Sequence, residues 1–166
     1  MKKVWIAGGT ALCLLLSACG GATEEELVAQ ALSLELPKPA SISYEDTHGG
    51  AHGDGETFAV LTFDENTAQT VESMLSEADW KALPMEENLS LFAFGGEKDG
   101  MNYTYNALAS HNVAVPEQGW YWFLDRHSEA EDAHSAEGLL DRASINCSLA
   151  LYDADKDTLY YYEMDT

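Results

Sequence analysis

The fold is decided late in the chain, by SINCSLALYD at residues 144–153 and TLYYYE at residues 158–163. The first stretch has an apolar side chain at every second position from Ile145 to Leu151, and the second is rich in aromatic residues. Alternation and aromatic enrichment are typical of strands, and the Ala-Asp-Lys-Asp between them suits a turn. We therefore predict an antiparallel hairpin. Cys147 lies on its apolar side, so we expect a buried, unreactive thiol rather than a nucleophile.

Two amphipathic helices are predicted in the first half of the chain. Residues 24–35 carry apolar side chains along one side, and Thr23 with Glu26 fits a capping box. Residues 67–79 show a second helical stripe, with Asp64 and Asn66 available as N-caps. Both helices should bury one face against a sheet.

Other segments are expected to add strands to this sheet. Residues 57–63 are apolar on both alternating faces, which favours a central strand covered on both sides. Residues 89–94 are also apolar, and we predict a strand that returns through a glycine-rich turn. The remaining expected strands are 42–44, 101–107 and 120–124. The fold class is therefore α+β, an antiparallel sheet with two N-terminal-half helices packed on one face.

Composition limits what the protein does. The chain has 166 residues, 29 acidic and 8 basic, for a formal net charge of −21. Phosphate contacts need clustered Lys and Arg, so we expect no nucleic-acid partner. A hydrophobic fraction of 46% favours a folded chain over disorder. At this length we predict one acidic domain over residues 24–166.

The first residues have the form of a secretory signal peptide. Lys2 and Lys3 precede an apolar run over 4–16, which is too short to span a membrane. The run closes with Leu-Ser-Ala-Cys at 16–19. These four residues resemble the lipobox of bacterial lipoproteins. The remainder of the chain also looks like small lipoproteins of Gram-positive bacteria, a likeness that implies no mechanism.

The lipobox resemblance implies a location. Residues 1–18 would be removed as the signal peptide, and residues 19–23 would form a short tether. Cys19 would carry a diacylglyceryl group and an N-acyl chain of the palmitate type, which anchors stably because several acyl chains insert. The protein would then lie on the extracytoplasmic face of the cell membrane, or on an outer-membrane leaflet in a cell with two membranes. No other cofactor is expected.

Loss of the leader would also change charge and cysteine content. It removes Lys2, Lys3 and no acid, so the formal charge becomes more negative by two. Such a domain would be held off an anionic membrane, although the charge could simply keep an exported domain soluble. Cys13 would leave with the leader and Cys19 would be lipidated, so Cys147 would have no partner for an intramolecular disulfide.

The most unusual stretch is HGGAHGDG at residues 48–55. His48, His52 and Asp54 are residue types that bind zinc and other transition metals. The glycines could instead expose backbone N–H groups as an anion-binding nest, or the stretch could be a plain flexible loop. All three interpretations stay open.

The loop over residues 125–142 is the second candidate. It starts with Asp125 and His127, which we regard as possible ligand-binding groups, and its further carboxylates suit calcium. The alternative is a solvated crossover loop with a helical turn over 137–140.

Two function classes follow. The chain contains no G-x-S-x-G, H-E-x-x-H, P-loop or dinucleotide fingerprint, and we identify no catalytic residue. We therefore expect a membrane-anchored extracytoplasmic lipoprotein that binds a small ligand or an envelope protein without catalysis. The alternative is a metal-dependent envelope enzyme that uses His48, His52 and Asp54, with His127 or His134 completing the shell.

Overall fold

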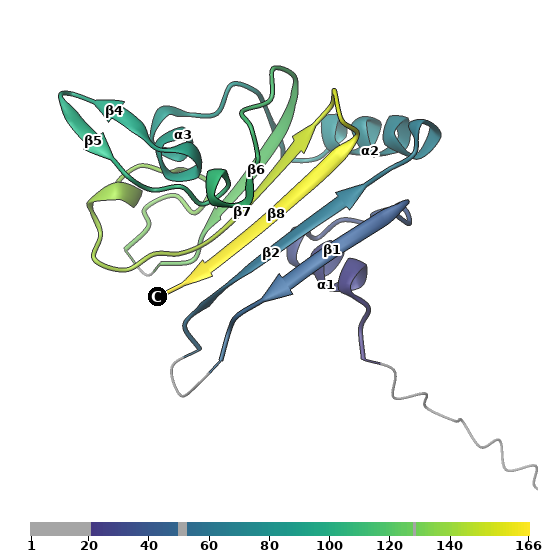
Figure 1. Cartoon of the computed structure of the whole chain (residues 1–166), viewed down its shortest axis with the longest axis horizontal. Coiled ribbons are helices and arrows are strands. Elements are labelled where there is room, and N and C mark those ends of the chain that lie inside the picture. The colour runs from purple at the N-terminus through teal and green to yellow at the C-terminus, as the bar shows by residue number, and fades with distance from the viewer. Residues whose placement is uncertain (1–20, 50–52, 128) are drawn as a thin grey trace, which may run out of the picture.

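A computed structural model describes residues 21–49, 53–127 and 129–166. In that part of the chain it contains three α-helices, one six-stranded antiparallel sheet and one separate two-stranded hairpin (Figure 1). The predicted α+β class with an antiparallel sheet is confirmed. The leader, the lipobox with Cys19, and His52 lie outside the described residues.

The large sheet is centred on the last strand of the chain. Its spatial order is β1-β2-β8-β7-β6-β3, and every neighbouring pair is antiparallel. The predicted hairpin is β7–β8, with Leu149 opposite Tyr162, so β8 lies between β2 and β7. The strand bounds are β1 Ser41–Asp46, β2 Gly55–Thr62, β3 Lys81–Ala82, β6 Gly119–Asp125, β7 Asn146–Asp153 and β8 Thr158–Asp165.

Two helices cover one face of this sheet, as predicted. They are α1 (Glu24–Leu32) and α2 (Glu65–Glu77), and their buried side chains pack onto the faces of β2, β7 and β8. Thr23 and Glu26 form the expected capping box, and the Asp64 carboxylate accepts the backbone N–H groups of Asn66 and Thr67. The caps hold both helix starts by satisfying donors that have no partner within the helix.

The third helix, α3 (Glu87–Phe94), covers the opposite face, and here the predicted strand over 89–94 is wrong. A short run that is apolar throughout cannot distinguish a buried strand from a buried helix. Leu89, Phe92 and Ala93 are all buried against the sheet, so the helix is apolar on nearly every side. The predicted partner strand over 101–107 is shorter than expected, because β5 (Met101–Tyr103) pairs with β4 (Gly96–Lys98) in a small hairpin of its own.

Alternation along β8 divides its tyrosines between the two cores. Tyr160 and Tyr162 pack on the α3 face, whereas Tyr161 packs on the face covered by α1 and α2. Cys147 is fully buried on the α3 face, and burial raises the pKa of its thiol to about 12. No helix among the described residues is long and apolar enough to span a membrane.

Candidate functional site

A row of polar side chains crosses the sheet at one end of the face covered by α1. The strand registers place Asp46 opposite Thr57, Thr57 opposite Glu163, and Glu163 opposite Ser148. Side chains on directly opposed residues of neighbouring strands share one face. The next row along the strands includes Ala59, Tyr161 and Ala150, and it belongs to the apolar core. The core therefore ends in a polar strip built from four strands.

The turn after β1 adds His48 to this strip. Thr47 and Glu56 exchange hydrogen bonds that close the hairpin end, from Thr47 N to Glu56 O at 2.8 Å and from Glu56 N to Thr47 Oγ1 at 2.9 Å. A Cβ atom at Gly55 would lie 2.6 Å from the backbone nitrogen of His48. Only glycine leaves room for so close an approach, so the sequence of the turn places the His48 ring beside the end of the sheet.

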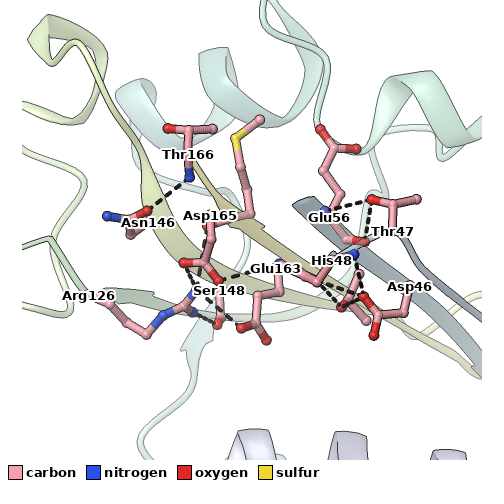
Figure 2. A network of polar contacts seen from close by, with 12 residues as sticks. Asp46, Thr47, His48, Glu56, Arg126, Asn146, Ser148, Glu163, Asp165 and Thr166 are labelled. Atoms are coloured by element: carbon pink, nitrogen blue, oxygen red, sulfur yellow. Dashed lines mark hydrogen bonds and ion pairs between the residues drawn. The ribbon is translucent and has the colours of Figure 1, made fainter. Parts of the chain in front are cut away.

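His48 lies between two carboxylates. Its backbone N and its ring Nδ1 are 2.9 Å and 2.7 Å from Asp46 Oδ1, and its Nε2 is 3.4 Å from Asp165 Oδ2 (Figure 2). The hydrogen bonds from the His48 backbone and ring hold the pKa of Asp46 below its usual value. In a neutral imidazole only one of the two ring nitrogens carries a proton, so Nδ1 and Nε2 cannot both act as donors at the same time.

Arg126 approaches Asp165 from the side opposite His48 and also contacts Glu163 (Figure 2). Its Nη2 lies 2.7 Å from Asp165 Oδ1 and 3.2 Å from Glu163 Oε1, and its Nη1 donates to Ser148 Oγ. Burial alone would lower the pKa of Arg126, but the ion pairs to Asp165 and Glu163 outweigh it and raise that pKa. The Tyr161 hydroxyl donates to the other Glu163 oxygen. Burial and this hydrogen bond raise the pKa of Tyr161.

One wall of a groove, which we call the α1 groove, consists of Asp46, His48, Thr57, Tyr161, Glu163 and Asp165. It has a volume of about 280 Å³. The helix wall consists of three apolar residues, of which Leu27 is 41% exposed. The complete lining is Leu27, Val28, Ala31, Tyr44, Asp46, His48, Thr57, Tyr161, Glu163 and Asp165.

The electrostatics of the α1 groove are one-sided. Three carboxylates, from Asp46, Glu163 and Asp165, line the groove, whereas the one guanidinium of Arg126 pairs with Glu163 and Asp165, so the carboxylates outnumber the guanidinium by two. Each carboxylate still has an exposed surface, between 28% and 44% of its side chain. The groove can bind a small molecule, because one wall offers hydrogen-bond acceptors and the other offers apolar contact.

The predicted His/Gly site is only partly assembled here. His48 is in the groove, whereas Asp54 is exposed and His52 lies outside the described residues. Among the residues that the structure describes, no three His, Cys, Asp or Glu side chains come together as a metal-binding group. The metal hypothesis for His48, His52 and Asp54 stays a prediction, and elemental analysis of the purified protein tests it.

The candidates at the start of the 125–142 loop make contacts within the fold, and the ligand-binding hypothesis for Asp125 and His127 stays a prediction. Asp125 is fully buried on the α3 face, where it pairs with the guanidinium of Arg142 and accepts the backbone N–H of His127 at 2.9 Å. The His127 ring nitrogen Nε2 lies 3.2 Å from Ser144 Oγ. The loop also lines a cavity of about 620 Å³. Its acidic side chains there are Glu129, Glu131, Asp132, Glu137 and Asp141.

Four residues of this cluster were not predicted as site residues: Asp46, Arg126, Glu163 and Asp165. Their convergence depends on the register of β8 against β2, which no local pattern reveals. The sequence offered two local indications of side chains that share a face. Asp46 and His48 are two residues apart, and Glu163 and Asp165 are two residues apart on one strand. Residues at that spacing share a strand face.

Comparison of this chain with family models, curated proteins and solved structures yields no significant match.

Proposed function

We propose that this chain is a lipid-anchored extracytoplasmic lipoprotein that binds a small ligand in the α1 groove and carries out no catalysis. The observation that carries the location is the Leu-Ser-Ala-Cys motif at residues 16–19, placed after a basic start and an apolar run. The observation that supports binding is the α1 groove, with its apolar helix wall and polar strip.

The short distance between the motif and the folded domain supports this proposal. Thr23 caps α1 only four residues after Cys19. An extended chain covers at most about 3.6 Å per residue, so such a tether reaches about 14 Å. Lipidation of Cys19 would therefore hold the start of α1, and with it the helix wall of the α1 groove, close to the membrane surface.

Metabolic labelling tests the anchor. The full chain is expressed in a bacterium fed a palmitate analogue that carries an alkyne, and the membrane and soluble fractions are compared after dye coupling. We expect the wild-type protein to be labelled and membrane-bound, and Cys19→Ser to lose the label and accumulate as uncleaved precursor.

Cys147→Ala is the matched control, because it removes the buried cysteine and leaves the motif intact. We expect it to be labelled like the wild type. Label that persists in Cys19→Ser, or an unlabelled wild-type protein, would overturn the anchored location. A groove that binds nothing would overturn the second half of the proposal independently.

A further inference from the structure

We propose that the ligand of the α1 groove is a small organic cation, an aliphatic amine with its ammonium group on the polar strip and its carbon chain against α1. This inference rests on the proposed function, because it names the chemical class of the ligand that the groove binds. It is argued from the groove's charge, its size and its two unlike walls.

The negative charge of the α1 groove disfavours anionic ligands and favours cationic ones. Asp46, Glu163 and Asp165 supply three carboxylates, and Arg126 compensates one of them. An anionic ligand would have to displace or share Arg126, which is already held by two carboxylates and by Ser148. An ammonium group donates three hydrogen bonds and accepts none, so it complements a wall of carboxylate oxygens.

The geometry leaves carboxylate oxygen available to such a group. Asp165 uses Oδ1 for Arg126 at 2.7 Å and faces His48 Nε2 with Oδ2 at 3.4 Å. The His48 Nε2 atom is buried and forms no hydrogen bond within the described part of the chain. A carboxylate oxygen accepts more than one hydrogen bond, so Asp165 and the 44%-exposed Asp46 retain acceptor capacity toward the groove.

The helix wall determines that the cation is organic. Leu27, Val28 and Ala31 offer no ligand atom to a bare metal ion, and the exposed part of Leu27 remains in water unless an apolar group covers it. Burial of this apolar area against a carbon chain removes it from water and favours binding. Tyr44 also lines the groove, and a tyrosine ring attracts cations through its face.

Size limits the ligand further. A volume of about 280 Å³ lies near the lower end of the range of roughly 300–1,000 Å³ that is usual for small-molecule pockets. A five-carbon diamine has seven non-hydrogen atoms and fits this volume, whereas a folded protein partner does not enter it. We therefore infer a free aliphatic amine, with one ammonium on the polar strip and the second end toward solvent.

Nuclear magnetic resonance tests the inference on the full chain in a neutral detergent. The ¹⁵N-labelled protein is titrated separately with 1,5-diaminopentane, pentylamine, 1-pentanol, pentanoate and calcium chloride. We expect saturable shifts of the amides of Tyr44, His48 and Asp165 with both amines, and affinities at least tenfold weaker for pentanol and pentanoate. Raising the salt to about 1 M, where the screening length is about 3 Å, should weaken amine binding severalfold.

Two variants provide the matched comparison. Asp165→Asn removes a groove carboxylate and should weaken diamine binding at least tenfold, whereas Glu131→Gln removes one negative charge from the 125–142 loop and should change it less than twofold. The spectrum of each variant shows directly whether it is folded.

The outcomes separate this inference from the function on which it rests. If pentanol or pentanoate binds in the groove as well as the amines, the groove is a binding site but its ligand is not defined by positive charge. Equal shifts with calcium chloride would show a counterion effect and would also overturn the amine. If no probe shifts the groove amides, both the ligand class and the binding role of the α1 groove fail.

Discussion

Arg142→Met should destabilise the protein strongly, because it leaves the buried Asp125 carboxylate without its cation. The Asp125 side chain is 0% exposed and the Arg142 side chain 9%. After the substitution, the one donor to the carboxylate among the described residues is the backbone N–H of His127, at 2.9 Å. Removing one partner of a buried ion pair typically costs about 3–5 kcal/mol. That is a large part of the roughly 5–15 kcal/mol that holds a domain folded.

Urea unfolding followed by tryptophan fluorescence measures this loss. Trp120 and Trp122 lie in β6, the strand that ends at Asp125, so their emission reports on the affected region. With a slope of about 2 kcal/mol per molar urea, a loss of 3–5 kcal/mol lowers the midpoint by roughly 1.5–2.5 M.

Arg126→Met is the matched control. Arg126 is 29% exposed and its partners Glu163 and Asp165 are similarly accessible, so water screens the pair and the loss should be about 1 kcal/mol. The double variant Asp125→Leu/Arg142→Met should recover much of the stability, because it removes both buried charges. A loss below about 1 kcal/mol in Arg142→Met, or a double variant less stable than the single one, would refute this reasoning.

Three further predictions concern single groups. The Tyr152 hydroxyl is buried and has no hydrogen-bond partner within the described residues, so Tyr152→Phe should leave the unfolding free energy unchanged or raise it by about 1 kcal/mol. Tyr161→Phe is the comparison variant. It loses the hydrogen bonds to Glu163 and Ser148, so it should lower the unfolding free energy in the same urea assay. Cys147 should resist a thiol-reactive chromophore at pH 8 until the protein is denatured, because the thiol is buried and its raised pKa keeps it protonated; rapid reaction of the native protein would contradict its burial. The hydrogen bonds from His48 lower the pKa of Asp46 in the folded state, so the contribution of Asp46 to stability is present above about pH 4 and is lost as the pH falls through the lowered pKa. The difference in unfolding free energy between the wild type and Asp46→Asn should therefore shrink below about pH 4. A difference that stays constant with pH would contradict this.

The local patterns predicted those elements whose signals are local. The capping box of Thr23 and Glu26, the Asp64 cap and the alternation from Ile145 to Leu151 depend on side chains a few residues apart. They identified α1, α2 and β7. The misassigned helix α3 has no such signal, because it is buried between a sheet face and the crossing loops and does not need a polar side.

In the candidate site, too, local patterns identified single residues but not the partners that the fold brings to them. His48 stood out because histidine and glycine cluster around it, but its partner Asp165 is far away in the sequence and is brought to it by the pairing of β2 with β8. Asp125 and His127 stood out for their residue types, and in the structure the buried Asp125 pairs with Arg142 while the half-buried His127 lies beside Ser144. Residue type identifies groups that are able to bind, and only the strand register identifies which of them meet.

The central position of β8 has a consequence for the order in which the molecule forms. A chain that emerges from a ribosome or a translocation channel exposes β1 and β2 first and β6 and β7 much later, and residues 158–165 join these two halves. Pairing over such a sequence separation is slow, since loop closure precedes any gain from contact. Until residues 158–165 are available, β2 and β7 have no strand between them, so the six-stranded sheet cannot close. Glu163 and Asp165 lie on this strand, so the polar strip of the α1 groove is complete only after β8 has paired.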